Sequence, residues 1–345
     1  MLILSSRSEV IRVKDKRIVL LTHCDMDGVI CAVVTKAKYP NAEIKFAQPF
    51  SLVKSLQEIG KCDLLIVADL EVSEKVAKKV KSILKKYKND GSIIVFADHH
   101  PATEKSLSDL ADLSFILLYR RDKCAAQLLC ETMFPNSASQ HLKTLVNMAA
   151  IYERKMSPKE DEIAHFESTF LTKALQRDVW DDDFRLMIVN ELASGKLPSE
   201  IPKVISRAVD THQRFLEALE KAEKRVKKLS DGLFFVDVTD LRAPGVWGAV
   251  ARKISYRNRG VVVMLCPSNT KGRYIVVARS PREFKANLTS IVVPACSAVG
   301  GDAGGHEGAV GGKIPQDAVE PFVELLKFYY KKHVGGFGNA ENEMS

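Results

Sequence analysis

Carboxylates and imidazoles gather in three short stretches near the start of this 345-residue chain. HCDMD at 23–27 follows one apolar run, Asp69 ends a second, and DHH at 98–100 ends a third. Crowded carboxylates raise one another's pKa values, and a divalent cation removes that penalty. Imidazole and carboxylate without thiolate suit Mn²⁺, Co²⁺ or Fe²⁺ better than a structural zinc ion. These residue types therefore indicate a divalent-metal site.

Each stretch also has an ordinary structural explanation. The run from Asp25 to Gly28 could form a turn or a calcium loop, although Lys36 stands where an EF-hand needs Glu. Asp69 could cap a strand end, and the adjacent histidines could form a surface pair. Their shared position at the ends of consecutive predicted strands favours the metal site instead. Two ions ~3.5–4 Å apart could bind a phosphoryl oxygen, activate water and stabilise a leaving oxygen.

Strands and helices alternate through the first hundred residues. Strands are predicted at 17–22, 43–47, 63–68 and 92–97, and helices at 29–38, 51–60 and 73–87. This alternation predicts an α/β fold with a doubly wound parallel sheet. Since the carboxyl ends of parallel strands share one edge, where ligands bind, the three stretches should converge there.

The remaining chain predicts further helices, a long connecting helix and a smaller second domain. Helices are expected at 124–134, 141–154, 184–192 and 204–229, then β-like runs at 234–238, 261–265 and 274–278, with helices near 246–257 and 316–332. We therefore expect a catalytic α/β domain at 1–195 and a helical linker at 196–232. A smaller mixed α/β substrate-binding domain should follow at 233–335, with the active cleft between the domains and a disordered tail at 336–345.

The composition is that of a globular chain, with 46% apolar and 27% charged residues. Its seven scattered cysteines form no C-x-x-C pair, so we expect reduced packing residues rather than disulfides or zinc ligands. No stretch approaches the ~18 apolar residues of a membrane span. We therefore expect a soluble, cytoplasmic protein without a membrane partner.

A glycine-rich segment at 300–313, GGDAGGHEGAVGGK, is the second distinctive feature. It has neither the P-loop pattern nor the G-x-G-x-x-G spacing of a dinucleotide site. Glycines at this density permit positive φ and close backbone approach, so that N–H groups can surround an anion. A flexible linker is the alternative, but Val299, Val310, Ile314 and the embedded His306 argue against it. The segment predicts a phosphate or nucleotide cradle.

Basic residues cluster between 252 and 285, within a chain of formal net charge +8. Tyr256, Tyr274 and Phe284 lie among them and could stack unpaired bases at ~1–3 kcal/mol each. A solvated basic surface is the alternative. We predict a single-strand groove whose affinity falls as salt rises. The nine basic residues are Arg252, Lys253, Arg257, Arg259, Lys271, Arg273, Arg279, Arg282 and Lys285.

The run LTHCDMDGVICA resembles the first motif of the DHH phosphoesterase family, IVADLE its second and FADHHP its third. The resemblance implies that Asp69 bridges two ions and that Asp98 supports the ligands. It also implies that His100 faces the scissile phosphate. The implied ligands are His23, Asp25 and Asp69 for one ion, and Asp27, Asp69 and His99 for the other.

The family's fourth motif usually supplies another Asp after a short apolar helix. The matching stretch here is NMAAIYE at 147–153, which puts Glu153 at that position. Asp178 is the competing candidate for the last ligand, although it could simply belong to the helix cap around 181–183. The last ligand therefore stays open between the two carboxylates.

The glycine-rich segment resembles the G-G-G-H-x-x-A-A-G motif of the DHH-associated C-terminal domain. Asp302 and Ala303 interrupt its glycines. The run 278–280 (ARS) similarly resembles that domain's phosphate-contacting strand. Together the resemblances cover about residues 17–335. They imply a substrate-binding set of Arg279, Ser280, Gly304, Gly305, His306 and Gly308.

The resemblance implies a RecJ-like exonuclease that hydrolyses single-stranded DNA or RNA to nucleoside 5′-monophosphates, 5′→3′, in replication or repair. It implies two divalent ions, with Mn²⁺ preferred and Mg²⁺ or Co²⁺ as substitutes. Its partner would be single-stranded nucleic acid and, by analogy alone, a helicase or replisome factor.

Two rival functions remain. One is an oligoribonuclease, pAp phosphatase or cyclic-dinucleotide phosphodiesterase that acts on short substrates. The other is a non-catalytic Cdc45-like replication scaffold, which only Glu153 favours. A family II pyrophosphatase is disfavoured because the glycine-rich motif belongs to another domain type.

Overall fold

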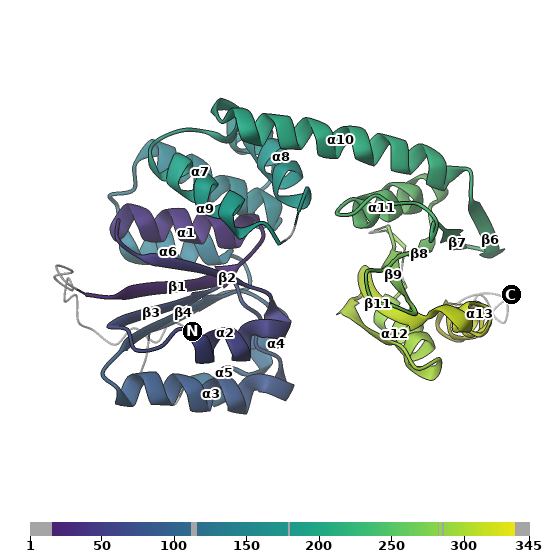
Figure 1. The fold of residues 1–345 in the computed structure, drawn as a ribbon, viewed down its shortest axis with the longest axis horizontal. Coiled ribbons are helices and arrows are strands. Elements are labelled where there is room, and N and C mark those ends of the chain that lie inside the picture. The colour runs from purple at the N-terminus through teal and green to yellow at the C-terminus, as the bar shows by residue number, and fades with distance from the viewer. Residues whose placement is uncertain (1–15, 112–115, 179, 282, 285, 335–345) are drawn as a thin grey trace, which may run out of the picture. The chain divides into compact units, whose positions relative to one another are not determined.

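The computed structural model describes residues 16–111, 116–178, 180–281, 283–284 and 286–334 (Figure 1). The tail expected at 336–345 lies outside this range, as do Arg282 and Lys285 of the basic cluster. The chain divides into two compact units, residues 1–208 and 209–345, here called unit 1 and unit 2.

Unit 1 is built on a five-stranded parallel sheet in the order β2-β1-β3-β4-β5. Its strands are β1 (Ile18–His23), β2 (Glu43–Ala47), β3 (Leu64–Ala68), β4 (Ile93–Asp98) and β5 (Ile116–Tyr119). All four strand pairs run parallel. The strands read as continuous apolar runs because helices cover both faces of the sheet. The predicted doubly wound α/β fold is confirmed.

Two helical layers sandwich this sheet (Figure 1). One contains α1 (Met26–Lys38), α6 (Ala125–Met133), α7 (Gln140–Tyr152), α8 (Glu162–Gln176) and α9 (Asp182–Ala193); the other contains α2 (Leu52–Glu58) and α3 (Glu74–Asn89). The short helices α4 (Pro101–Lys105) and α5 (Leu107–Ala111) follow β4. The sequence did not predict α8, because Ile163 and Phe166 are exposed and obscure its single apolar face.

The long helix α10 (Pro202–Glu223) ends earlier than expected, so its predicted extension to 229 was wrong. Residues Val226–Ser230 instead form β6, an edge strand of unit 2. Asp231-Gly232 is the two-residue turn between β6 and β7 (Leu233–Asp237), and Gly232 has φ +71°. Asp-Gly is a strong hairpin signal, and lysines are common on edge strands, so the run suits a strand as well as a helix.

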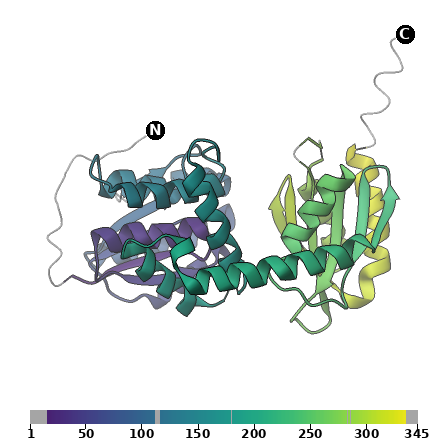
Figure 2. The same ribbon diagram turned by 90° about the horizontal axis from the view of Figure 1, so that it is seen from above.

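Unit 2 has a six-stranded mixed sheet in the order β10-β11-β9-β8-β7-β6. Its other strands are β8 (Val261–Pro267), β9 (Arg273–Arg279), β10 (Asp302–His306) and β11 (Ala309–Pro315). Figure 2 shows this sheet between α11 (Trp247–Asn258) and α13 (Val319–Val334). The helix α12 (Leu288–Ala298), which was not predicted, contains Pro294 and packs on the α13 side. The predicted mixed α/β second domain is confirmed.

The glycine-rich segment is a β-hairpin rather than a loop. Its two strands, β10 and β11, pair antiparallel from Asp302 opposite Lys313 to His306 opposite Ala309. Ladder bonds therefore occupy many of the N–H groups expected to surround an anion, although β10 lies at the edge of the described sheet.

All seven cysteines are buried and unpaired. Among the described residues, no helix is long and apolar enough to cross a membrane.

Candidate metal centre

The turn from β1 into α1 places three side chains of the first motif close together. His23 ends β1, Asp25 caps α1 by accepting a hydrogen bond from the Gly28 N–H, and Asp27 lies in the first helical turn. Gly28 is required here, because a Cβ atom at this position would lie 2.0 Å from the His23 carbonyl oxygen. The tight contact between helix and strand sets where the ligands point.

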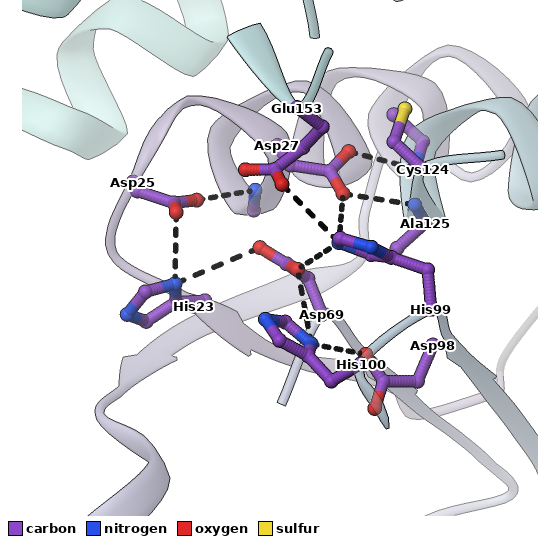
Figure 3. A network of polar contacts seen from close by, with 12 residues as sticks. His23, Asp25, Asp27, Asp69, Asp98, His99, His100, Cys124, Ala125 and Glu153 are labelled. Atoms are coloured by element: carbon purple, nitrogen blue, oxygen red, sulfur yellow. Dashed lines mark hydrogen bonds and ion pairs between the residues drawn. The ribbon is translucent and has the colours of Figure 1, made fainter. Parts of the chain in front are cut away.

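The imidazole of His23 faces two carboxylates (Figure 3). Its Nδ1 lies 3.1 Å from Asp25 Oδ2 and 3.6 Å from Asp69 Oδ2. Its Nε2 lies 3.2 Å from Oε1 of Gln48, which follows β2. If Nε2–H donates to Gln48, Nδ1 is the ring nitrogen that faces the carboxylates and could bind an ion shared with them. Sequence reasoning missed Gln48, because an uncharged residue after a strand carries no local signal.

Asp69 follows β3 in a left-handed conformation with φ +56°, which is uncommon for a residue other than glycine. Its N–H donates to the Ala97 carbonyl, and its side chain is only 1% exposed. The surrounding structure must hold this backbone in place, and such strain often marks a functional site.

A second group of side chains surrounds His99. His99 Nε2 lies 3.4 Å from Asp69 Oδ1, 3.6 Å from Asp27 Oδ2 and 3.7 Å from Glu153 Oε2. Asp69 therefore directs one oxygen toward the His23 group and the other toward the His99 group (Figure 3). This is the arrangement that a bridging carboxylate requires.

Asp27 is held by the first turn of α6. Its two carboxylate oxygens accept hydrogen bonds of 2.8 and 2.9 Å from the Ala125 and Ala126 N–H groups. These donors are orphan groups at a helix start, which favour a carboxylate. The contact joins residues about a hundred positions apart, so no local pattern could have revealed it.

Asp98 positions His100. One Asp98 oxygen lies 2.7 Å from His100 Nδ1, and the other accepts a hydrogen bond from the Thr103 hydroxyl. Burial opposes the charged form of His100, but Asp98 outweighs it and raises the pKa of His100 to about 10. With Nδ1 engaged, Nε2 is the ring nitrogen that can donate to a ligand.

The two candidates for the last ligand are in different surroundings. Glu153 caps the C-terminus of α7 and reaches the His99 group. Asp178 is exposed and accepts a hydrogen bond from the Trp180 N–H. The geometry thus brings Glu153, not Asp178, to the cluster.

The cluster concentrates charge that the protein alone does not neutralise. Burial and the nearby charge of Asp69 raise the pKa of Asp27 to about 7, and burial with Asp25 and Asp27 raises the pKa of Glu153 to about 7. Burial and Asp25 raise the pKa of Asp69 well above its usual range.

The pKa values of His23 and His99 shift in opposite directions. Burial disfavours the charged form of His23, but Asp25 and Asp69 outweigh it and raise the pKa of His23 to about 12. Burial and the charge of His100 lower the pKa of His99. Only one of these two rings therefore offsets the carboxylate charge as a cation near neutral pH.

Three buried atoms in this cluster have no hydrogen-bond partner: His23 Nδ1, Asp69 Oδ2 and His99 Nε2. Buried polar atoms are normally paired, so a facing set of unpaired nitrogen and oxygen atoms calls for another partner. All three atoms can act as metal ligands, and a divalent cation would satisfy them together. The donor set therefore fits divalent ions.

In unit 2, the sheet register aligns two of the predicted substrate-binding residues. Ala309 of β11 lies opposite Arg279 of β9 on one side and His306 of β10 on the other. Arg279 and His306 thus share one cross-strand row with a small residue between them. Next to this row, Ser280 donates a hydrogen bond from its backbone N–H to the Gly308 carbonyl. Gly304 is exposed in β10.

Gly305 is required by its backbone. It has φ +149°, and a Cβ atom there would lie 2.2 Å from the Ala309 carbonyl oxygen.

Comparison with known proteins gives the family context. Residues 232–332 match the DHHA1 domain. None of the curated proteins matches the chain by sequence. The whole fold is similar to the pGpG-specific phosphodiesterase PggH from Vibrio cholerae, with a TM-score of 0.60, 13% identity, and coverage of 91% of this chain and 99% of that one.

RecJ with Mn²⁺ from Thermus thermophilus gives a TM-score of 0.63 at 12% identity, covering 92% of this chain and 52% of that chain. This chain has a RecJ-like fold with a DHHA1 domain. CDC45 from Entamoeba histolytica is also similar, with a TM-score of 0.57, 9% identity, and coverage of 92% of this chain and 96% of that one. The TM-scores show a shared fold, and at identities of 9–13% they show the fold alone; the resemblance drawn from the motifs holds at that level.

Arg279 is a partly buried cation of the DHHA1 domain. Its Nη1 donates to the Ala278 carbonyl, its Nε is buried without a hydrogen-bond partner, and no carboxylate among the described residues pairs with it. Burial and the charge of Arg252 lower its pKa to about 10. Gly248 makes room for the guanidinium, since a Cβ atom there would lie 2.9 Å from Arg279 Nη2. An anionic ligand would relieve this unpaired charge.

The DHHA1 domain offers less stacking surface than the sequence suggested. Tyr256 is 43% exposed, but Tyr274 and Phe284 are only partly exposed and pack against the core on the α13 side. The interpretation of all three as open stacking faces was therefore wrong, because two of the rings pack partly against the core. Arg257 is ion-paired with Glu223, which removes one member of the basic cluster.

Proposed function

We propose that this chain is a divalent-metal-dependent phosphodiesterase that hydrolyses single-stranded nucleic acid. The observation that carries this proposal is the position of Asp69. Its two oxygens face separate groups, one around His23 and the other around His99, with unpaired buried atoms in both. Two ions, with Mn²⁺ preferred over Mg²⁺ or Co²⁺, would suit this arrangement.

Each group would hold one ion, with Asp69 shared. His23 and Asp25 would complete one site, and Asp27, His99 and Glu153 the other. When bound, such ions polarise a phosphoryl oxygen and lower the pKa of an attacking water.

The chain's own residues would orient the substrate. His100 donates from Nδ1 to Asp98, so its Nε2 would donate to a phosphoryl or leaving oxygen. Thr103 holds the second oxygen of Asp98 and fixes the ring's direction. In the DHHA1 domain, Arg279 and His306 would bind a further phosphate of the strand, helped by Ser280 and the backbone at Gly308.

We favour a RecJ-like exonuclease that releases nucleoside 5′-monophosphates in the 5′→3′ direction. Support comes from the likeness to RecJ in fold and from the residues of the three DHH motifs. A short-substrate phosphodiesterase is the second candidate. The packing of Tyr274 and Phe284 against the core favours it, since it leaves a long strand less aromatic surface on which to stack.

Digestion of end-labelled single-stranded DNA and RNA tests the proposal. Oligonucleotides from dinucleotides to long strands would be compared with Mn²⁺ and with Mg²⁺. We expect stepwise release of monophosphates from long strands with Mn²⁺, and no release by Asp69→Asn. Asn tolerates the left-handed backbone at this position, so Asp69→Asn should fold. Asp63→Asn, an exposed change at the opposite end of β3, is the control.

The outcomes separate the candidates. Cleavage confined to dinucleotides would reject the exonuclease and support the short-substrate enzyme. Failure to cleave any oligonucleotide with any divalent ion would favour a non-catalytic scaffold, as in the Cdc45-like alternative.

A further inference from the structure

A pocket of about 270 Å³ opens beside the His23 group of unit 1. His23 and Asp25 form part of its wall, so a ligand that occupies it would lie next to the metal centre. Thr172 and Gln176 of α8 and Tyr152 of α7 line another part. Apart from the first motif and Tyr152 of the 147–153 stretch, none of the motif residues described above lines this pocket.

Three polar side chains of this lining have no hydrogen-bond partner within the described part of the chain. Among the described residues, no hydrogen bond involves the side chains of Tyr152, Thr172 or Gln176. Thr172 and Gln176 are four positions apart on α8 and so lie on the same helical face. Their hydroxyl and amide groups can each donate and accept, as the edge of a nucleobase requires.

The rest of the lining combines apolar surface with polar side chains that already have partners, such as Gln48, which contacts His23. Met26 and Leu175 are almost fully buried and contribute apolar surface. Arg185 also lines the pocket, but its Nη1 is ion-paired with Asp182 and its Nε donates to the Cys24 carbonyl. A guanidinium with these partners favours a neutral ligand group over a second phosphate.

We propose that this pocket binds the nucleoside attached to the phosphate at the Asp69 cluster. This inference rests on the proposed phosphodiesterase function and adds a base-recognition subsite to it. The volume of about 270 Å³ lies just below the ~300–1,000 Å³ of typical small-molecule pockets, which limits the ligand to one small group such as a single nucleoside. Thr172 and Gln176 bond the base edge, while Tyr152 contacts the base or the sugar.

Calorimetric binding to the Mn²⁺-loaded protein tests the subsite. The ligands are the four nucleoside 5′-monophosphates and ribose 5-phosphate, which carries the phosphate and sugar without a base. We expect at least one nucleotide to bind about tenfold tighter than ribose 5-phosphate, as two hydrogen bonds to a base can provide. The double variant Thr172→Val with Gln176→Leu should reduce this ratio to about one.

A matched control and a second substrate make the outcomes distinct. Thr169→Val, an exposed change on the same helix with a hydroxyl bonded to the His165 carbonyl, should keep the tenfold ratio. If the double variant is poorly folded by circular dichroism, Thr172→Val alone replaces it and should lower the ratio about threefold. A ratio of one in the wild type, or an unchanged ratio in the variants, would overturn the subsite.

Hydrolysis of bis(p-nitrophenyl) phosphate, a phosphodiester without a base, tests the underlying function separately. If the wild type cleaves it with Mn²⁺ but shows no base preference, only the subsite proposal fails. If the wild type cleaves neither this substrate nor any oligonucleotide, the phosphodiesterase proposal fails as well.

Discussion

Carboxylate burial has a thermodynamic consequence at the residue scale. The pKa of Glu153 rises from 4.5 to about 7 through burial and the charges of Asp25 and Asp27. The folded metal-free protein therefore binds a proton more tightly than the unfolded chain does. The free energy of unfolding therefore falls as the pH rises from about 4.5 to about 7, because the buried carboxylate must ionise in the folded state. Above about pH 7 this cost to stability is complete and stays constant. A bound divalent ion would remove this cost.

Glu153→Gln should therefore stabilise the metal-free protein at pH 8 and have little effect near pH 4.5. Gln keeps the size of the side chain but removes a charge that is unfavourable only when ionised. We expect the melting temperature of unit 1, residues 1–208, to rise by several degrees at pH 8, since ~1 kcal/mol shifts it by about 2–4 °C in a domain of this size. Differential scanning calorimetry of the wild type and the variant in EDTA measures this change in melting temperature.

The same pair of proteins tests metal ligation. Added Mn²⁺ should raise the melting temperature of the wild type more at pH 8 than at pH 5.5. At each pH, Mn²⁺ should raise the melting temperature of Glu153→Gln less than that of the wild type. Equal Mn²⁺ shifts in the two proteins would contradict a role for Glu153 as a ligand. Glu131→Gln, an exposed change on α6, serves as the control.

At the element scale, one glycine determines whether the first motif can form. Gly28 lies in the first turn of α1, against the end of β1. Because a Cβ atom would lie 2.0 Å from the His23 carbonyl oxygen, any larger residue must push α1 away from the strand. That movement would separate His23 from the Asp25 and Asp27 carboxylates.

Gly28→Ala should destabilise the protein by about 1–3 kcal/mol, the usual cost of overpacking, and abolish Mn²⁺-induced stabilisation. Gly311→Ala is the control, because a Cβ atom there meets nothing within 4 Å. Urea unfolding with and without Mn²⁺ measures both effects. An unchanged Mn²⁺ response in Gly28→Ala would show that the spacing of α1 and β1 is unimportant for the site.

The elements that carry the ligands were also the ones that the sequence predicted best. Apolar runs bounded by turns identified β1, β3 and β4, and parallel pairing then brought their carboxyl ends to one edge. Helices α8 and α12 escaped prediction because exposed apolar residues or an internal proline obscure their pattern. Gln48 and the N–H groups of Ala125 and Ala126 could not be predicted, since only tertiary packing brings them to the site.

At the scale of the whole molecule, each unit contains the core that supports its own candidate site. The metal cluster draws only on elements of unit 1, which packs around its parallel sheet. The Arg279 and His306 row belongs to the mixed sheet of unit 2. Metal binding and strand binding should therefore respond to different substitutions.

Arg279→Gln should weaken binding of single strands about tenfold while leaving the Mn²⁺-induced rise in melting temperature unchanged. The guanidinium has no carboxylate partner among the described residues, so an anionic phosphate is the ligand that its charge favours. Losing one phosphate contact should also reduce the slope of log K against log salt by about 0.7. Arg257→Gln is the matched control. Arg257 is already ion-paired with Glu223, so this substitution should leave the slope unchanged. Fluorescence anisotropy of a labelled single strand across a salt series measures both slopes. Equal slopes for Arg279→Gln and the wild type would mean that this arginine does not contact the strand, and that its unpaired charge has a structural rather than a binding role.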